Sequence, residues 1–258
     1  MKGKLTILGS GTSQGVPVIA CDCKVCSSTD AKDNRTRTSV LIHINGENHV
    51  IDTGPDFRAQ MLRENVQSLK SVIFTHEHKD HIAGLDDVRP FNFKEKRSMN
   101  VYASERVEQA LLREYHYIFA ANKYPGVPNI NLTLFENEKF EIDKGIELVP
   151  IEVLHFKLPV FGFRIGDITY ITDAKTISEK EKEKIKGSNI LIINALRREP
   201  HMSHFNLDEA LAFIEEVKPL RAYLTHISHL FGTHAEIENE LPHNVHMAYD
   251  GLSLDFTY

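Results

Sequence analysis

Three histidines and one aspartate, all able to bind a metal ion, lie within six consecutive positions, from His76 to His81. They follow the short apolar run Ser71–Phe74, whose length and β-branched content predict a buried strand. Side chains alternate along an extended segment, so His76 and His78 project to one side, while Asp80 and His81 can point to a second position. Such a run would rarely arise by chance in a surface loop, and imidazole with carboxylate favours zinc, manganese or iron. The segment therefore predicts a site for two adjacent cations.

Other strand-like segments end at side chains of the same kind. Loops that follow strands collect at one edge of a scaffold, where binding sites are usually built. We therefore expect these side chains to meet the first group in space. The segments are Val50–Ile51 before Asp52, Glu147–Leu154 before His155, Ile168–Ile171 before Asp173 and Arg221–Leu224 before His226.

The remaining patterns indicate an α/β chain with mixed sheets covered by helices. Leu207–Val217 has one apolar face (Leu207, Leu211, Ile214, Val217), and Asn206 with Glu209 forms a capping-box signature. Ser178–Lys186 is a charged segment typical of a solvated surface helix, and Gly166-Asp167 is typical of a hairpin turn. With no repeat or obvious linker, we expect a single domain over residues 1–258. Further strands are expected at Leu5–Leu8, Ser39–Ile44, Phe161–Ile165 and Ile190–Ile193.

The overall charge restricts the classes of partner. The 258 residues carry 30 Lys and Arg against 36 Asp and Glu, giving a formal net charge of −6 without any basic block. A protein that grips a long nucleic acid neutralises many phosphates, so nucleic acid is a disfavoured partner. No long apolar run and no charged-then-apolar leader is seen, so we expect no membrane partner and a cytoplasmic location.

All three cysteines lie within six positions, at Cys21, Cys23 and Cys26. Three cysteines cannot all pair, and neighbours this close form strained disulfides. Metal ligation therefore explains their clustering better than three buried free thiols do.

The run His76-Glu77-His78-Lys79-Asp80-His81 after a strand, with Asp52-Thr53-Gly54 ending an earlier one, resembles the signature of the metallo-β-lactamase superfamily. The resemblance extends over nearly the whole chain and implies an αββα sandwich with two metals at one edge of the sheets. It implies that Asp52 orients metal ligands without binding metal itself. The implied ligands are His76, His78 and His155 for one metal, Asp80, His81 and His226 for the other, and Asp173 as the bridge.

A narrower resemblance involves the segments Leu8–Pro17, Cys21–Cys26 and Leu224–His229, which are similar to the PhnP type of phosphodiesterase. Enzymes of that type hydrolyse the cyclic phosphate of a phosphoribose. The resemblance implies a structural zinc held by Cys21, Cys23, Cys26 and His229, and a closed Cys₃His set leaves no position for water. It also implies a catalytic role for His204, which stands 22 residues before His226.

These resemblances imply a metal-dependent phosphodiesterase for a small phosphate ester, with cyclic diesters included. Two active-site cations, zinc or manganese, would activate water and neutralise phosphoryl charge, and His204 would protonate the leaving group. Asp80 is also a candidate catalytic residue, although its carboxylate stays ionised beside the cations. His78 stands where oxygen-reducing diiron relatives usually have a carboxylate, which favours hydrolysis over redox chemistry.

Three other functions share this metal core. They are tRNA 3′-processing endonuclease, thioester or lactone hydrolase, and non-catalytic accessory protein of quinone-cofactor biosynthesis. The sequence contains no Gly- and Lys-rich arm for tRNA, and the complete ligand set disfavours a non-catalytic role. The expected partner is a small-molecule phosphate ester, and homodimer formation is left open.

Overall fold

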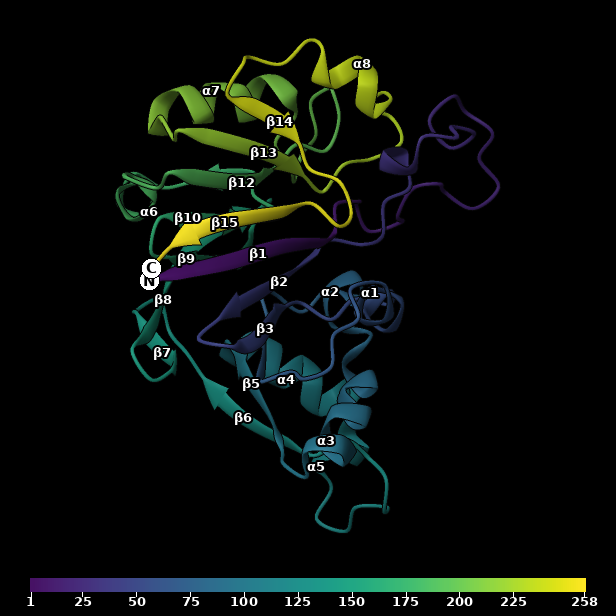
Figure 1. Cartoon of the computed structure of the whole chain (residues 1–258), viewed down its shortest axis with the longest axis vertical. Helices are drawn as coiled ribbons and strands as arrows, with labels where there is room; N and C mark the ends of the chain where they lie inside the picture. Colours follow the sequence, from purple (N-terminus) through teal and green to yellow (C-terminus); the bar gives the residue numbers. More distant parts are fainter.

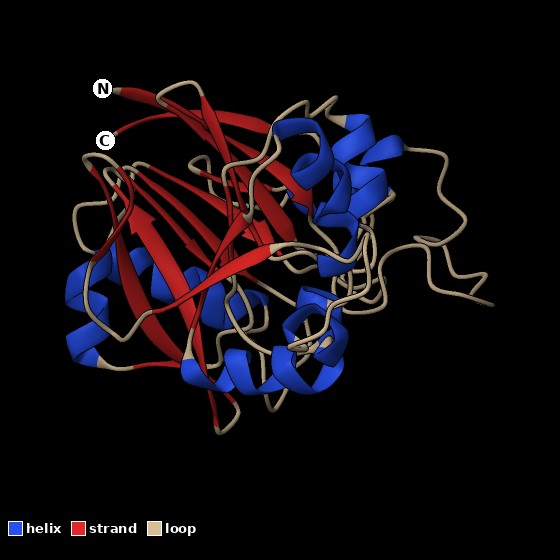
Figure 2. Ribbon diagram, turned by 90° about the horizontal axis from the view of Figure 1, so that it is seen from below, coloured by secondary structure: helices blue, strands red, loops and turns tan.

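Two mixed β-sheets lie face to face between outer layers of helices in the computed structural model, which describes residues 1–258 (Figures 1 and 2). The first sheet has the strand order β15-β1-β2-β3-β4-β5-β6. The pairs β15–β1, β1–β2 and β2–β3 are antiparallel, whereas β3, β4, β5 and β6 run parallel to one another. Its strands are β1 (Lys2–Gly9), β2 (Ser39–Ile44), β3 (Glu47–Ile51), β4 (Ser71–Ile73), β5 (Met99–Ala103), β6 (Ile130–Leu134) and β15 (Ser253–Thr257).

The second sheet has the order β11-β8-β9-β10-β12-β13-β14, with β7 paired to β8. It also divides into an antiparallel part, up to β10, and a parallel part, β10, β12, β13 and β14. Its strands are β7 (Phe140–Asp143), β8 (Ile146–His155), β9 (Leu158–Ile165), β10 (Ile168–Ile171), β11 (Thr176–Ile177), β12 (Ile190–Asn194), β13 (Arg221–Thr225) and β14 (Val245–Met247).

Helices of the chain's first half lie on the first sheet, and those of its second half lie on the second sheet (Figure 1). None of them is both long and apolar enough to cross a lipid bilayer. The helices are α1 (Phe57–Arg63), α2 (Lys79–Ile82), α3 (Arg89–Glu95), α4 (Glu105–Glu114), α5 (His116–Phe119), α6 (Glu179–Ile185), α7 (Leu207–Val217) and α8 (His234–Glu238), with 3₁₀ turns at Ala31–Asp33 and Leu85–Val88.

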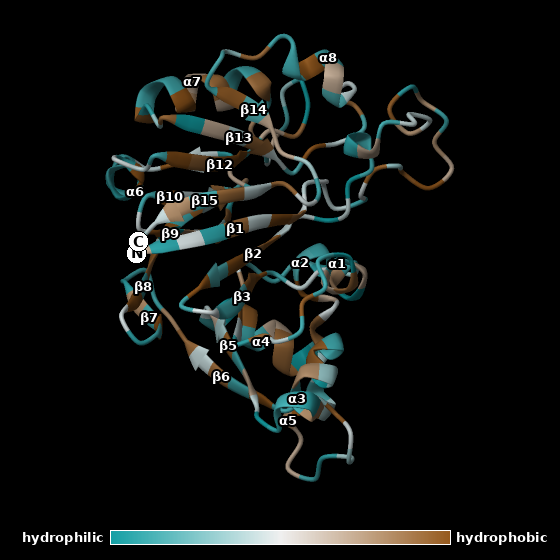
Figure 3. Ribbon diagram, in the orientation of Figure 1, coloured by the Kyte–Doolittle hydropathy of each residue, from teal (hydrophilic) through white to brown (hydrophobic).

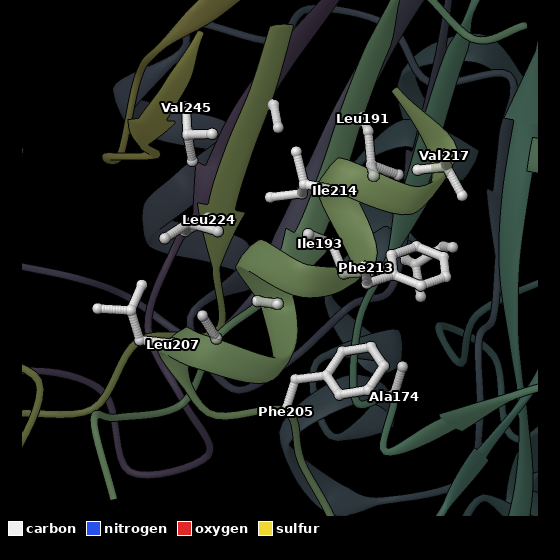
Figure 4. Packing of buried hydrophobic residues seen from close by; sticks show 14 of the residues in the cluster. Ala174, Leu191, Ile193, Phe205, Leu207, Phe213, Ile214, Val217, Leu224 and Val245 are labelled. Carbon is white, nitrogen blue, oxygen red and sulfur yellow. The ribbon is translucent and has the colours of Figure 1, made fainter. Parts of the chain in front are cut away.

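Three buried apolar clusters hold the four layers together. One joins the first sheet to α1–α5, one lies between the sheets, and one joins the second sheet to α6–α8. In the third cluster Phe213 and Ile214 of α7 pack toward Leu191, Ile193 and Leu224 of the sheet (Figure 4). Figure 3 shows the same division, with hydrophobic residues on β12 and hydrophilic ones on the outer helix α6. The αββα sandwich predicted from the sequence is confirmed.

Helix α7 has the predicted bounds and capping box. The Asn206 side chain accepts a hydrogen bond from the backbone of Glu209, and the Glu209 side chain bonds back to the Asn206 backbone. The predicted apolar face packs on the second sheet, since Leu207, Ile214 and Val217 are buried there and Leu211 is partly buried against the same cluster. Ala210 and Phe213 extend this face.

Candidate metal centre

The predicted active-site residues come from both sheets. His76 lies two positions beyond Phe74 after β4, His78 precedes α2, and Asp80 and His81 lie within α2. From the second sheet, His155 ends β8, whereas Asp173 and His226 lie just beyond β10 and β13. The edge where the two sets of strands end therefore collects all seven side chains predicted to bind active-site metals.

Asp173 lies at the middle of this group. One carboxylate oxygen, Oδ1, is 3.2 Å from His226 Nε2, and the other, Oδ2, is 3.4 Å from His81 Nε2. His81 Nε2 is also 3.2 Å from Asp80 Oδ2. Ligand atoms of Asp80, His81 and His226 lie within 4.8 Å of one another, as do those of His76, His81 and Asp173. This arrangement suits a carboxylate shared between two cations.

The other predicted set is brought together more loosely. His76 Nε2 is 3.1 Å from His78 Nδ1, and the His78 and His155 rings are 5.2 Å apart between centroids. The ligand atom of His155 groups within 4.8 Å with those of Asp173 and His204. His204 therefore lies close enough to this site to act on a substrate or to contact a metal.

Three residues of the site have a left-handed backbone although they are not glycine. The φ angles are 66° at Asp52, 59° at Asp173 and 57° at His226. In each case a strand ends and the chain turns so that the side chain faces the shared edge. Such conformations cost free energy and cluster at functional sites.

Asp52 is fully buried and fixes two neighbours. It accepts hydrogen bonds from Thr75 N (2.8 Å) and Thr75 Oγ1 (2.7 Å), and its Oδ2 lies 2.7 Å from His81 Nδ1. Thr75 Oγ1 also lies 2.9 Å from His76 Nδ1. The bond at His81 Nδ1 directs Nε2 toward the site, which is the orienting role that the resemblance implies for Asp52.

Two orienting residues were not recognised in the sequence. Thr75 directly precedes the run His76–His81 and bonds to Asp52. Asn194, at the end of β12, accepts a bond from Ala174 N (2.8 Å) and donates to Ala174 O (3.0 Å), so it fixes the turn that carries Asp173. Only its position directly after the predicted strand Ile190–Ile193 could have indicated this orienting role.

The buried nitrogens of the site indicate that a metal fits there. His81 Nε2 and both ring nitrogens of His226 are buried without a hydrogen-bond partner. Burial disfavours a charged imidazole, yet the surrounding carboxylates outweigh burial and raise the pKa of His81 well above its usual value. Burial likewise opposes ionisation of Asp173, but His226 and His81 outweigh it and lower the pKa of that carboxyl. Ionised carboxylates beside free imidazole nitrogens form a donor set that favours a divalent cation.

The cysteine cluster forms a second possible metal site. His229 Nδ1 lies 3.3 Å from Cys21 Sγ, 3.5 Å from Cys23 Sγ and 3.6 Å from Cys26 Sγ. The backbone N–H of Cys26 donates to Cys23 Sγ and, despite burial, lowers the pKa of Cys23 to about 6. Three thiols and one imidazole at these separations match a closed tetrahedral zinc site.

This second site attaches the N-terminal loop to the strand end that carries His226. Thr12 N donates to Ile227 O (3.0 Å), and Ile227 N donates to Ser10 O (2.9 Å). His229 follows two residues later. The loop therefore lies beside the active edge, projecting to the upper right in Figure 1.

A hollow of about 500 Å³ opens beside His78 and His155. Its lining includes Arg106, Phe156 and Lys157, none of which was singled out in the sequence. Phe156 and Lys157 directly follow His155, whereas Arg106 is distant in the sequence and reaches the hollow only in the fold.

Comparison with known proteins agrees with this geometry. A family model described as the beta-lactamase superfamily domain matches residues 47–227. A solved diphosphatase of the PhnP family is 40% identical, with a TM-score of 0.93 over 99% of this chain and 98% of that one. Zinc-bound PqqB from Methylobacterium extorquens superposes with a TM-score of 0.81 at 20% identity, over 98% of this chain and 100% of its own, a likeness of fold alone.

A curated relative is a longer protein. An octanoyltransferase of Porphyromonas gingivalis is 40% identical over 249 residues, which are 95% of this chain. The present chain spans 50% of the length of that protein.

Proposed function

The chain belongs to the metallo-β-lactamase superfamily and, within it, to the PhnP family, and from this premise we propose that it is a metal-dependent phosphodiesterase for small phosphate esters, cyclic diesters included. The observation that carries the proposal is the Asp173 carboxylate, placed between His81 and His226 with Asp80 at their side. A relative of 40% identity, described as a diphosphatase, supports phosphorus–oxygen bond cleavage as the chemistry.

In this proposal two divalent cations, zinc or manganese, are held at the shared edge. His76, His78 and His155 would hold one, Asp80, His81 and His226 the other, and Asp173 would contact both. Cations so placed lower the pKa of water and neutralise charge on phosphoryl oxygens.

The chain itself supplies orientation. Asp52 holds His81 through Nδ1, and the backbone carbonyl of Ser203 accepts a hydrogen bond from His155 Nδ1 at 2.9 Å. Both imidazoles therefore present Nε2 to the site, so that little rearrangement is needed on binding. Asp80 is assigned to holding the cation and keeping the local charge balanced.

His204 is proposed to deliver a proton to the departing oxygen. Its Nδ1 is buried without a partner and lies 3.8 Å from Asp173 Oδ1, and its ring stacks 4.7 Å from that of His226. A side chain so close to the reacting centre could donate to a leaving alkoxide.

A second candidate function is hydrolysis of an acyl thioester. The name of the Porphyromonas gingivalis relative involves acyl transfer, although half of that protein lies outside the match. The same pair of cations could polarise a thioester carbonyl. A tRNA endonuclease is less favoured because the net charge is −6.

Turnover by the purified chain would separate these functions. We expect manganese- or zinc-dependent hydrolysis of bis(p-nitrophenyl) phosphate, with little activity on an octanoyl thioester or a tRNA precursor. The matched control is Asp173→Asn, because asparagine tolerates the left-handed backbone at this position but removes the charge. A parent enzyme that cleaves the thioester and leaves the diester intact would contradict the proposal, and inactivity on all three would favour an accessory role.

A further inference from the structure

We propose that the hollow lined by Arg106, Phe156 and Lys157 binds the non-reacting half of the substrate, and that this half carries a planar aromatic ring, as a nucleotide does. The inference rests on the proposed phosphodiesterase function, because it assigns a substrate class to the same site. It starts from an unusual feature of the hairpin that follows His155.

Phe156 occupies a backbone position that suits glycine. Strands β8 and β9 pair His155 with Leu158, so Phe156 and Lys157 form a two-residue turn. The φ angle of Phe156 is 57°, in the left-handed region. Tight hairpin turns place Gly or Asn at such positions, and a bulky side chain there is strained.

Packing does not offset this strain. Phe156 is 51% exposed, although an aromatic ring of this size usually contributes to stability by burial. Met202, which lines the same hollow, is 67% exposed. An unfavourable backbone and an uncovered ring, next to a predicted metal ligand, point to a function in binding. The chemistry that a phenyl face recognises best is another flat ring.

Two basic side chains line the same hollow. Lys157 Nζ is 5.4 Å from the centroid of the Phe156 ring. Arg106 donates from Nε (3.2 Å) and Nη2 (2.7 Å) to Glu77 Oε1, which fixes the guanidinium and leaves other N–H groups free. The charge of Arg106 is balanced by Glu77, whereas Lys157 forms no ion pair and would attract an anionic ester. Ring and charge together match a nucleotide better than a simple alkyl phosphate.

Two diesters with the same leaving group test the inference. Thymidine 5′-(4-nitrophenyl phosphate) carries a base, whereas methyl 4-nitrophenyl phosphate does not. We expect kcat/KM for the thymidine ester to exceed that for the methyl ester, and we expect Phe156→Gly to lower this preference about tenfold, the usual size of one base–aromatic stack. Phe156→Trp should restore it.

The matched control is Phe93→Ala, which removes a phenyl ring that is 64% exposed on α3 and lies outside the hollow. This variant should leave the preference unchanged. The melting temperature of Phe156→Gly should not fall below that of the parent, because glycine relieves the left-handed strain. Retained stability would separate a lost contact from a damaged fold.

Product binding keeps the test independent of turnover. By calorimetry, thymidine 5′-phosphate should bind the parent about tenfold tighter than inorganic phosphate, and Phe156→Gly should remove the difference. If neither ester reacts but thymidine 5′-phosphate still binds more tightly than phosphate, the proposed phosphodiesterase reaction is refuted and the proposed ring-binding subsite is supported. The inference would be overturned by equal affinities for the two ligands or by an unchanged preference in Phe156→Gly. It would also be overturned if Phe156→Gly changed the molecular mass in solution, because Phe156 would then contact a second copy of the chain.

Discussion

Asp52, Asp173 and His226 share a backbone geometry that side-chain chemistry alone would not require. Each follows a buried strand, and each has a φ angle between 57° and 66°. A strand that continued straight would carry these side chains past the shared edge of the sheets. The left-handed turn aims them back toward one another, at a cost of about 1–2 kcal/mol per residue. The fold stabilises three such turns around one small volume, which supports the prediction that this volume binds metal.

His204 lies in the same volume but is not one of the seven predicted metal ligands. Burial, with the neighbouring His226, lowers the pKa of His204 to about 2, so the acid role requires the negative charge of a bound phosphate ester to raise this pKa again. We expect His204→Ala to lower kcat about 10²–10⁴-fold for a diester with a poor leaving group, because general acid catalysis has that magnitude. The loss should shrink for p-nitrophenyl esters, whose leaving group needs little protonation.

Metal content is the control for His204, because one of its ring nitrogens lies within 4.8 Å of ligand atoms of His155 and Asp173. Unchanged metal with a leaving-group-dependent loss would support the acid role. Equal losses on both esters would assign His204 to phosphate binding, and lost metal would make it a ligand.

His49 allows a test of pH-dependent stability away from the site. Burial lowers the pKa of His49 to about 4, and its Nδ1 lies 2.8 Å from Ser71 Oγ while Nε2 has no partner. The unfolded chain takes up the proton near pH 6.5 and the folded chain only near pH 4, so stability is present above pH 6.5 and falls as the pH is lowered through this window. The loss should amount to about 3 kcal/mol at most.

The variant His49→Gln cannot titrate, so its free energy of unfolding should fall less between pH 7 and pH 4.5 than that of the parent. Urea unfolding of both chains in the presence of chelator measures this, because metal loss then affects neither curve. Parallel pH dependences would contradict a buried neutral histidine at this position.

At the level of elements, strong local patterns were predictable and pairing partners were not. The apolar runs Ser39–Ile44 and Ile168–Ile171 and the helix Leu207–Val217 have the bounds that their sequences indicate. Strand β15 was missed because its place depends on β1, at the opposite end of the chain. Strand β5 was missed because Met99–Ala103 is not a continuous apolar run, and its alternating burial spans only five residues. Helix α4 was missed although Ser104 caps it, so a local signal was present there.

The site shows the same division. Ligand-type residues could be predicted because each follows a recognisable strand. Thr75, Asn194 and the hollow around Phe156 could not, because their roles depend on which strand ends and loops lie next to one another in the fold. The spacing of residues along the sequence does not show which distant segments contact one another.

The N-terminal loop is the element with the most specific expected response. Cys23→Ser should remove the zinc predicted at the cysteine cluster and lower the melting temperature by several degrees, because a structural metal contributes folding energy directly. The active-site metals should still bind, since none of the four cluster residues is among the predicted ligands of those metals. Elemental analysis and thermal unfolding measure both effects.

The control for this variant is Ser27→Ala in the same loop, where the Ser27 hydroxyl donates only to Asp22 O. It should keep both the zinc and the melting temperature. Full zinc content in Cys23→Ser would show that Cys23 is not a zinc ligand and that the predicted Cys₃His site is wrong.

For the whole molecule, the predicted active-site metals join its two halves. His76, His78, Asp80 and His81 come from the first sheet, and His155, Asp173 and His226 come from the second. An apolar cluster without directional preference also lies between the sheets, and a few hydrogen bonds, such as Phe161 N to Thr75 O (3.1 Å), cross between them. Cations between them would therefore bind the folded arrangement and not the unfolded chain, and so stabilise it in proportion to their concentration.

Mild chelation should accordingly lower both the metal content and the melting temperature. We expect about three metals per chain at first and about one, zinc on the thiolates, after chelation, because the His and Asp ligands should exchange more readily than the cysteine cluster. A cation present at 1,000 times its Kd contributes about 4 kcal/mol, so the melting temperature should fall on the order of 10 °C and recover when manganese is added. In Asp173→Asn the charge between His81 and His226 is gone, and the response to manganese should be much smaller. One metal per chain throughout, or a melting temperature that manganese does not change, would mean that the two sheets are held together without cations at their shared edge.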